Sequence, residues 1–599
     1  MTNVLPARAE VPRESTWDLE CLFPDAETWE AAFAAVEAGV PEVAEFAGRL
    51  SEGPEILAAF FTKAEKLQNA LSKVAVWANL HYTADTTDAE AQGRADRAIG
   101  LVSRVSAAVA FWTPELLSIG VDTLKGWADS HAALGIYKHY FDQLGRKAAH
   151  TRSAEVEQTL ALASDALRSA SRIHGILTDA DLTFAPASDG SPVGQSTIGK
   201  LLVDADREVR RSAWESYADA HLAHKNALAQ CLSTGVKQNV FIARVRGYES
   251  SLHAALEPNY IPTSVFESLI DAFQRHLPVW HRYWGLRRKA LGLEKLAPYD
   301  VKAPLGPASE PVAYADSVEW IAEGMAPLGG DYVNVLRRGS GPERWVDWAC
   351  NVGKRMGAFS SGTVGTHPYI LMSYNDDLFS LSTLAHELGH SLHSYYSRKT
   401  QPFIYAGYGL FAAEVASNFN QALVRAYLLE KFADNPAMLI GVLEEAMSNF
   451  HRYFFIMPTL ARFEREIHDR VWRGEALSPR SLNGLMTELF TEAFGPEVEI
   501  DADRVGCTWM QFSTHLYANF YVWQYATGIA GAHALASRVL AEGESAAKDY
   551  LGFLNAGGSL YPLDALKRAG VDLASSQPVE AAFKVMEGYV DRLESLLAS

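Results

Sequence analysis

The chain has 599 residues, of which 48% are hydrophobic and 21% charged, with a formal net charge of -19 and a pI of about 5.4. These proportions are typical of a folded globular protein and exclude a disordered or low-complexity chain. The acidic balance repels phosphate backbones, so we expect no nucleic-acid partner. The length allows between one and three domains.

The first ten residues carry charges and a proline where a secretory signal would have its apolar stretch, and no run of about 18 apolar residues occurs. We therefore expect a cytoplasmic protein that does not bind membranes. The four cysteines form no Cys-x-x-Cys pair, which argues against a disulfide framework and against a thiolate zinc site. We expect mostly buried, reduced thiols at Cys21, Cys231, Cys350 and Cys507.

The N-terminal part predicts one helix after another, because apolar residues recur there at spacings of three and four. The predicted helices are Glu27–Ala38, Pro41–Leu50, Pro54–Leu71, Ala89–Trp112 and Ala154–Ile173. Leu182–Thr197 differs, since it predicts a short strand, a Ser-Asp-Gly-Ser-Pro turn and a polar link. We place an approximate boundary there, between a helical N-terminal region (1–195) and a catalytic region (196–599).

The middle of the chain alternates between helical and irregular patterns. Asp204–Arg244 and Ser264–Leu291 predict helices, whereas Leu296–Pro311 contains too many prolines for a regular helix and predicts a connection between two lobes. His367–Tyr374 predicts a strand of a small sheet, with a proline near its first residue. After Ser397 we predict helices almost to the C-terminus, broken by loops at Thr400–Gly409, Gly474–Ser478 and Gly557–Pro562.

Phe379–Tyr396 predicts a helix that contains a His-Glu-x-x-His motif between His386 and His390. Two histidines four residues apart lie on one helical face, so both imidazoles can reach one metal ion. Glu387 then points at the remaining position of that metal. With 18 histidines in the chain, a chance match on an exposed helix is a weak explanation. The motif predicts a zinc hydrolase of peptide bonds.

Other residues predict how this helix starts and packs. We predict Ser380 or Ser382 as its N-cap, with Asp376 and Asp377 just before the positive end of the helix dipole. Gly389 costs about 1 kcal/mol in a helix interior relative to alanine, so we predict that another backbone approaches it closely. The leucines predicted to pack into the core recur every four positions: Leu384, Leu388 and Leu392.

Catalytic zinc needs three protein ligands and an open position, so the histidine pair requires a third ligand. A third histidine six residues after His390 is excluded, because that position is Tyr396. Glu414 lies 24 residues after His390 on a strongly apolar predicted helix, where a buried carboxylate is costly unless it binds a cation or a partner. The alternative is a glutamate at a helix edge that faces water. We favour Glu414 as the third ligand.

These residues resemble a known family. His386–His393 followed by Phe411–Ser417 is similar to the signature of the thimet-oligopeptidase-like zinc metallopeptidases, and specifically of their oligoendopeptidase F branch. Pro368–Met372 and Arg246–Ser250 also fit that branch. The resemblance is dense from about residue 200 to the C-terminus. Departures from the branch pattern at Ser373 and at 380–382 concern only local substrate contacts.

The resemblance implies a mainly α-helical, bilobed enzyme with a deep substrate channel, which cuts internal bonds of short unstructured peptides. It implies one zinc ion per chain, held by His386, His390 and Glu414, with Glu387 as general base and acid. Zinc would lower the pKa of its bound water toward about 7, and Glu387 would move a proton from that water to the leaving amine. We interpret His393 as a packing or supporting residue, because the ligand set is already complete.

Thr508–Gly528 is rich in aromatic residues, and we predict one helix there. Aromatic residues at helical spacing usually belong to a core, but Tyr517, Tyr521 and Tyr525 stand four apart and would form a stripe of hydroxyl groups. The resemblance implies that a histidine and tyrosines of this region donate hydrogen bonds to the substrate. We assign His515 and Tyr521 to catalysis, and Tyr517 and Tyr525 to substrate binding.

The predicted strand between Tyr369 and Tyr374 has two interpretations. An exposed edge would pair with an extended peptide through main-chain hydrogen bonds, which makes both tyrosines candidate substrate-binding residues. An internal strand is equally consistent with the sequence.

Three functions remain open. The first is an endopeptidase, and the second is a related zinc carboxypeptidase or dipeptidase, which needs a positively charged pocket for the terminal carboxylate. The third is a peptide-binding protein with structural zinc. It is disfavoured, because structural sites use four protein ligands, commonly cysteines, and no cysteine accompanies this motif.

Overall fold

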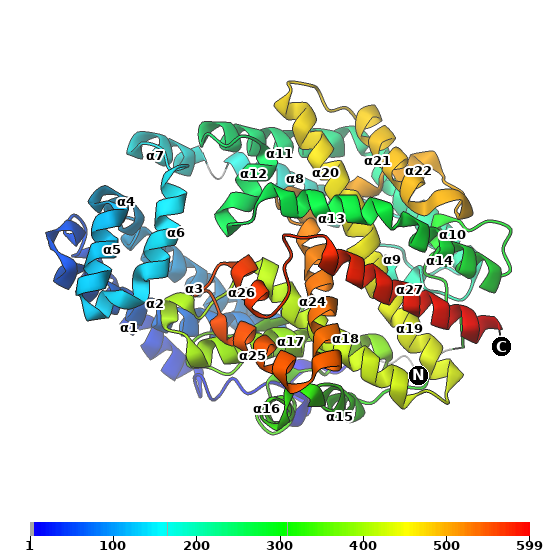
Figure 1. Ribbon diagram of the computed structural model, residues 1–599, viewed down its shortest axis with the longest axis horizontal. Coiled ribbons are helices and arrows are strands. Elements are labelled where there is room, and N and C mark those ends of the chain that lie inside the picture. The colour runs from blue at the N-terminus through cyan, green and yellow to red at the C-terminus, as the bar shows by residue number, and fades with distance from the viewer. Residues whose placement is uncertain (1–4, 164–165, 308, 599) are drawn as a thin grey trace. The chain divides into compact units, whose positions relative to one another are not determined.

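The computed structural model describes residues 5–163, 166–307 and 309–598. Helices dominate these residues (Figure 1). A small three-stranded sheet lies directly before the helix that carries the His-Glu-x-x-His motif. The predicted mainly α class with a small sheet is therefore confirmed. None of the described helices is long and apolar enough to span a membrane.

The chain forms two compact units, and each is assembled from three separate segments. The first unit comprises Met1–Thr151, Pro311–Tyr427 and Leu535–Gly570. The second comprises Arg152–Glu310, Leu428–Ala534 and Val571–Ser599. The boundary expected from the sequence, between residues 195 and 196, lies inside the second unit and stays a prediction.

Among the N-terminal helices of the first unit, α2 packs against α1 and α3 (Figure 1). Their core contains large aromatic side chains such as Trp29, Phe60 and Trp77, and it continues into Tyr369 and Leu371 of the sheet. The N-terminal helices and the sheet therefore share one core. The helices are α1 Ala26–Ala44, α2 Pro54–Ala84, α3 Ala89–Ala108, α4 Trp112–Ile119, α5 Val121–Ser130 and α6 Lys138–Ala148.

Two predicted boundaries in this part are wrong. α1 continues through Pro41, where a second helix was predicted to begin. Proline removes one backbone donor, so α1 lacks one hydrogen bond close to its C-terminal end, and the helix ends three residues later. The single helix predicted over Ala89–Trp112 is divided between α3 and α4.

The sheet consists of β1 Val346–Asp347, β2 Phe359–Ser361 and β3 Tyr369–Leu371, in the order β1-β3-β2. β3 pairs parallel with β1 and antiparallel with β2, so it is the internal strand. The edge-strand interpretation of this segment is therefore wrong.

The two tyrosines assigned to substrate binding in this segment point into the protein. Tyr369 has no exposed surface, and Tyr374 is buried with its hydroxyl group donating to the Val312 carbonyl at 2.9 Å and bonded to Ser317. We correct their assignment, because a peptide pairing with a strand edge would not reach them.

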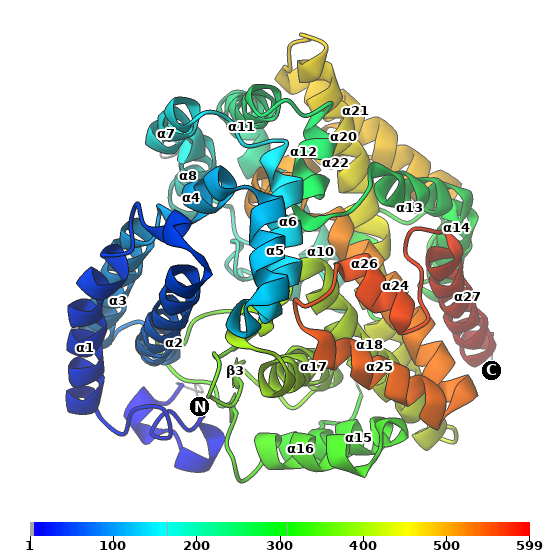
Figure 2. The same cartoon turned by 60° about the vertical axis from the view of Figure 1, so that its left-hand side comes forward.

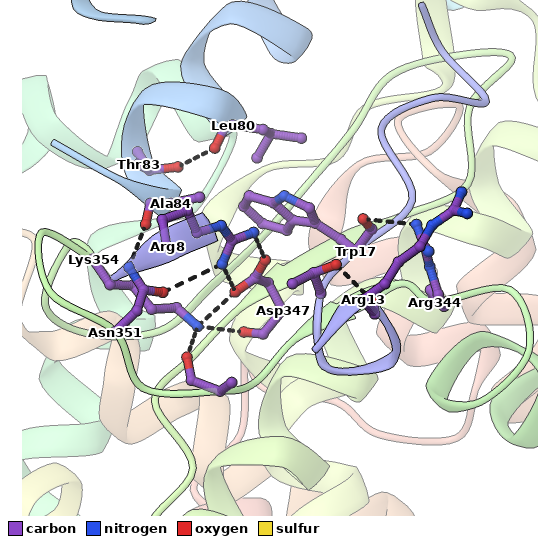
Figure 3. Close-up of polar contacts among 12 residues, drawn as sticks. Arg8, Arg13, Trp17, Leu80, Thr83, Ala84, Arg344, Asp347, Asn351 and Lys354 are labelled. Atoms are coloured by element: carbon purple, nitrogen blue, oxygen red, sulfur yellow. Dashed lines mark hydrogen bonds and ion pairs between the residues drawn. The ribbon is translucent and has the colours of Figure 1, made fainter. Parts of the chain in front are cut away.

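A buried ion cluster ties the N-terminal segment to β1 (Figure 3). The Asp347 carboxylate is fully buried and accepts hydrogen bonds from Arg8 Nη1 at 2.9 Å and from Lys354 Nζ at 2.7 Å. Asn351 Oδ1 also accepts from Arg8, at 3.3 Å. Burial lowers the pKa of Lys354, and the Asp347 charge opposes that shift. One buried carboxylate therefore serves two cations, of which Lys354 is buried and Arg8 is partly exposed.

The rest of the first unit surrounds the motif helix α17. α17 lies beside α25, which is more than 140 residues later in the sequence (Figure 2). α17 also contacts β2, β3 and α15. These elements are α15 Tyr314–Gly324, α16 Gly330–Ser340, α17 Leu378–Thr400, α18 Leu410–Lys431, α25 Glu544–Ala556 and α26 Pro562–Arg568. The loops predicted before α18 and α26 are confirmed.

The second unit is helical in its described part. The predicted strand within Leu182–Thr197 is wrong, although the turn at Gly190 is present, with a φ of 86°. Its helices are α7 Ala154–Ala163, α8 Ser169–Ile176, α9 Ile198–Leu201, α10 Arg207–Ala223, α11 Lys225–Val245, α12 Ser251–Leu256, α13 Thr263–Arg275, α14 Leu277–Ala290, α19 Pro436–His451, α20 Met457–Trp472, α21 Pro479–Phe494, α22 Ala502–Gly506, α23 Ser513–Tyr517, α24 Trp523–Glu542 and α27 Gln577–Ala598. The chain passes between the units inside α18 and α24.

Candidate active site

The start of α17 is set by an aspartate. Asp377 is the N-cap, and its carboxylate accepts the backbone N–H of Ser380 at 2.6 Å. The predicted caps Ser380 and Ser382 instead lie inside the first turns. Ser380 Oγ accepts the N–H of Asn375 at 3.0 Å, which closes the turn before the helix. A carboxylate is a strong acceptor here, because it also complements the helix dipole.

α17 and α18 cross in direct backbone contact at Gly389. A Cβ atom at this position would lie 2.6 Å from the Ala416 carbonyl oxygen and 2.6 Å from Ser417 Cα. The close approach predicted from Gly389 is confirmed. The stripe formed by Leu384, Leu388 and Leu392 is fully buried, as predicted.

This crossing brings the predicted ligands together. One ligand atom from each of His386, His390 and Glu414 lies within 4.8 Å of the others, and in the described part of the chain no other group of histidine, cysteine, aspartate and glutamate side chains meets the same criterion. His386 Nε2 is 3.8 Å from Glu414 Oε2. The two imidazole planes are nearly perpendicular, at 86°. Small side-chain rotations would bring all three donors onto one metal ion.

Gln421 orients the first histidine. Its side-chain oxygen lies 3.1 Å from His386 Nδ1, and its amide nitrogen donates to Ser382 Oγ at 2.7 Å. With Nδ1 bonded to an acceptor, the proton stays on Nδ1, and the Nε2 lone pair is left toward Glu414. Gln421 was missed in the sequence, although it stands seven residues after Glu414 and therefore on the same helical face.

Glu387 is buried without a partner for one oxygen. The residue is 6% exposed, and no group of the described chain bonds its Oε2 atom. Burial raises the pKa of its carboxyl group to about 7, and the Glu414 charge contributes in the same direction. A buried carboxylate oxygen without a hydrogen bond is costly, so this position needs an explanation outside protein stability.

His393 is a packing residue in this structure. Its ring is stacked on Tyr408, with centroids 3.6 Å apart, and burial lowers its pKa to about 3, so the imidazole is neutral. The Tyr408 hydroxyl group donates to the His390 carbonyl at 3.1 Å and lies 2.8 Å from Ser394 Oγ. This stacked pair therefore supports the helix turn that carries the second histidine of the motif. Tyr408 was not singled out in the sequence.

The aromatic segment predicted as one helix is broken in two. A short turn over Thr508–Gln511 precedes α23, and residues 518–522 separate α23 from α24. Asn519 and Phe520 have positive φ values of 25° and 54°, which are rare for residues other than glycine. The predicted stripe of tyrosines on one helical face is therefore wrong.

Three of the predicted residues nevertheless form a cluster in the second unit. The hydroxyl groups of Tyr521 and Tyr525 are 2.9 Å apart. The His515 ring lies 6.1 Å from that of Tyr521 and 6.0 Å from that of Tyr525. Tyr453 stacks on Tyr525, with centroids 5.0 Å apart. Burial and the nearby Arg452 charge lower the pKa of His515 to about 4, so its imidazole is neutral near pH 7.

Tyr517 lies apart from this cluster. Its ring contacts His174, with centroids 5.1 Å apart, and a Cβ atom on Gly235 would lie 3.2 Å from it. Because the chain turns after residue 517, the four-residue spacing does not place this tyrosine beside Tyr521. Its grouping with the other tyrosines is corrected.

Glu464 of α20 fixes the turn that breaks the aromatic segment. Its Oε1 atom accepts the N–H of Phe520 at 2.6 Å, and the carboxyl group has no exposed surface. Burial raises its pKa to about 8, so the group is protonated near pH 7. The His468 ring packs against Phe520 at 4.8 Å. Residues on α20 thus hold a backbone conformation that bulky residues rarely adopt.

Comparison with known proteins gives a consistent family. Residues 201–585 match the model of peptidase family M3, and residues 115–184 match that of the oligopeptidase F N-terminal segment. The oligopeptidase PepF of Bacillus subtilis is 38% identical, over 99% of this chain and 89% of its own length. The group B oligopeptidase PepB of Streptococcus agalactiae is 33% identical, over 99% of this chain and 98% of its own length.

A solved structure supports the same family. The crystal structure of oligoendopeptidase-F from Enterococcus faecium superposes with a TM-score of 0.75 at 29% identity, covering 96% of this chain and 99% of that chain. The family match spans more than half of the sequence, and the curated relatives match it from end to end. The chain belongs to peptidase family M3 and is a metalloendopeptidase of the oligoendopeptidase F type.

Proposed function

We propose that this protein is a zinc-dependent endopeptidase that hydrolyses internal peptide bonds of short unstructured oligopeptides. The observation that carries the proposal is the group formed by His386, His390 and Glu414, with Glu387 buried beside it. Family membership supplies the class of substrate, since the curated relatives are oligopeptidases. Cytoplasmic location stays a prediction from the sequence.

The donor set fits a catalytic zinc ion. Two imidazoles and one carboxylate are ligands that zinc prefers, and three protein ligands leave one position open. A structural zinc site would be closed by a fourth protein ligand, and no further histidine, cysteine, aspartate or glutamate joins this group among the residues described. Gln421 supports the fit, because it leaves the Nε2 atom of His386 available.

Each residue has a distinct role. Zinc, when bound, supplies a Lewis acid that polarises the scissile carbonyl and acidifies water. Glu387 accepts a proton from the attacking water and delivers it to the leaving amine. The position of its Oε2 atom, buried and without a protein partner, supports this role. No covalent intermediate with the protein is required.

His515 and Tyr521 are our candidates for hydrogen-bond donors to the substrate, with Tyr525 supporting Tyr521 through their hydroxyl contact. A donor aimed at the oxygen that becomes negative in the transition state contributes about 3 to 4 kcal/mol to the barrier. Tyr521→Phe should therefore lower kcat about 100- to 1,000-fold with zinc content unchanged. Full activity in that variant would remove Tyr521 from the mechanism.

The main test replaces the proposed base. Glu387→Gln keeps the side-chain shape, so we expect one zinc per chain by elemental analysis and no measurable hydrolysis. The matched control is Glu430→Gln, which makes the same chemical change at an exposed position of α18 and should keep wild-type activity. Appreciable turnover by Glu387→Gln, in enzyme free of wild-type contamination, contradicts the scheme.

The carboxypeptidase alternative is tested with blocked substrates. A peptide with an acetylated N-terminus and an amidated C-terminus has no free terminus to recognise. An endopeptidase cuts it at internal bonds, and mass spectrometry locates those cuts. A carboxypeptidase or dipeptidase leaves it intact and hydrolyses only the unblocked peptide.

A further inference from the structure

Glu464 of α20 is a buried carboxyl group without a cationic partner. In the described part of the chain, three aspartate and glutamate residues have no exposed surface, namely Asp300, Asp347 and Glu464. Each of the two aspartates forms ion pairs with two cations. The Glu464 side chain instead accepts one hydrogen bond, from the Phe520 N–H to its Oε1 atom at 2.6 Å, and its Oε2 atom has no partner among the described residues. An apolar side chain would fill this site at lower cost, so the bond to Phe520 needs a reason beyond packing.

The Glu464 bond holds a backbone conformation that needs support. Phe520 has a φ of 54° and follows Asn519, whose φ is also positive, and such residues keep this conformation only when their surroundings impose it. The Phe520 ring is buried against His468 of α20 at 4.8 Å and edge-on against Phe266 of α13 at 6.0 Å. These contacts fix the ring, and the Glu464 bond fixes the peptide group between Asn519 and Phe520.

Tyr521 comes directly after this turn and is held from both directions along the chain. Its carbonyl oxygen accepts the N–H of Gln524 in the first turn of α24 at 3.2 Å. Its hydroxyl group lies 2.9 Å from that of Tyr525 on the same helix. α24 therefore fixes Tyr521 on its C-terminal side, and the Glu464 bond to the preceding residue fixes it on its N-terminal side. The direction of the Tyr521 hydroxyl group depends on both.

We propose that Glu464 is a positioning residue for catalysis, because its hydrogen bond to the Phe520 N–H sets the orientation of Tyr521 toward the peptide. The proposal rests on the proposed function, since it takes Tyr521 to donate a hydrogen bond to the substrate. Glu464 itself contacts neither the metal nor the peptide in this scheme. Misplacing a catalytic group by about 1 Å costs up to about 100-fold in rate, so a small change in this turn is sufficient to lower turnover.

A set of variants separates the hydrogen bond of Glu464 from its volume. Glu464→Gln is the conservative variant, because the carboxyl group is neutral near pH 7 and the amide oxygen can still accept the Phe520 N–H. Glu464→Leu has a similar volume and no acceptor. Glu466→Leu makes the same change at a partly exposed position of α20, where the glutamate pairs with Arg470, and serves as the control. Thermal melting shows which variants fold, and Glu464→Met, with a more adaptable apolar side chain, replaces Glu464→Leu if the latter does not.

The kinetic expectation is a loss of kcat without a matching change in KM. Glu464→Leu should lower kcat about 10- to 100-fold, with KM changed less than about threefold and one zinc per chain. Glu464→Gln should recover most of the lost kcat, and Glu466→Leu should keep the wild-type value. A purely structural role would reduce the amount of folded enzyme and leave kcat per zinc-loaded chain unchanged, which would overturn the proposal.

The Tyr521→Phe background shows whether Glu464 acts through Tyr521. If it does, Glu464→Leu lowers kcat much less in this background than in the wild type, because the donor that it positions is already absent. If the two changes lower kcat independently, their effects multiply in the double variant, and the proposal is wrong.

A spectroscopic measurement tests the positioning without turnover. 3-Fluorotyrosine at position 521 reports the surroundings of this ring through its fluorine chemical shift, measured in the full chain without peptide. We expect the shift to move in Glu464→Leu and to stay in Glu464→Gln and Glu466→Leu. An unchanged shift in Glu464→Leu overturns the proposal.

Two further results separate this proposal from the proposed function. Full activity of Tyr521→Phe rejects the positioning role in catalysis even if the fluorine shift moves, whereas an inactive Glu387→Gln still supports the zinc-peptidase scheme. Conversely, activity of Glu387→Gln rejects that scheme, and the kinetic pattern of the Glu464 and Tyr521 variants would still support the positioning role.

Discussion

Replacing Gly389 with alanine tests how two helices build the metal site. The added Cβ atom would lie 2.6 Å from a carbonyl oxygen and from a Cα atom of α18, both of which are backbone atoms that cannot rotate away. Overpacking of this kind costs about 1 to 3 kcal/mol. Alanine regains about 1 kcal/mol of helix propensity, so we expect a net loss of up to about 2 kcal/mol.

We expect Gly389→Ala to weaken zinc binding more strongly than it destabilises the fold. α18 must move away from α17, and this separates Glu414 from His386 and His390, which lie on either side of the contact. We expect Gly389→Ala to bind zinc at least tenfold more weakly in competition with a chromophoric chelator, with unfolding followed in urea. The control Gly93→Ala places the same methyl group in open space on α3 and should leave zinc affinity unchanged. Wild-type zinc affinity in Gly389→Ala would refute the argument.

Three further changes test other parts of the structure. Gln421→Leu removes the acceptor for His386 Nδ1 and should weaken zinc binding about 10- to 100-fold, measured by chelator competition, whereas Gln421→Glu keeps an acceptor. Equal zinc affinities for the wild type and both variants would show that this hydrogen bond is unimportant. Asp347→Asn leaves Arg8 and Lys354 without their buried counter-charge and should cost about 3 to 5 kcal/mol in urea unfolding, so a loss below about 1 kcal/mol would contradict the account of the cluster. The pKa of Glu464 is raised from 4.5 to about 8 in the folded protein. The contribution of this carboxyl group to the free energy of unfolding is therefore fully present below pH 4.5 and is lost as the pH rises through about 8. The total loss is roughly 4 to 5 kcal/mol. Glu464→Gln stays neutral, and the difference in unfolding free energy between it and the wild type should grow in its favour across that range; a constant difference would mean that the carboxyl group does not titrate this way.

The metal ligands could be predicted because their signals are local or nearly so. The spacing of His386 and His390 reflects the helical period, and Glu414 stood out as a carboxylate on an apolar helix. Gly389 added a non-local signal, since its cost implied the backbone contact that joins the two helices. Gln421 lies at the same helical spacing but could not be singled out, because a buried amide costs less than a buried charge and therefore indicates a site less strongly.

The aromatic segment could not be predicted, because the residue that breaks it lies elsewhere. Its sequence has helical spacing throughout, and no glycine or proline lies between Thr508 and the turn at Asn519 and Phe520. Glu464, more than 50 residues earlier, supplies the hydrogen bond that holds this conformation. The strand at Tyr369 is present, but its edge or internal position could not be predicted for a related reason: a strand's sequence does not say which neighbours will pair with it, and here both sides are occupied.

The departures from ordinary folding rules gather on the elements assigned to function. Glu387 has a buried oxygen without a hydrogen bond, and Phe520 has a positive φ. Each of these costs stability, and each has an alternative that the same fold would tolerate more easily. Selection for stability alone would remove them. Their persistence beside His386 and His515 is expected if the missing partners, a metal-activated water and a peptide, arrive only during catalysis.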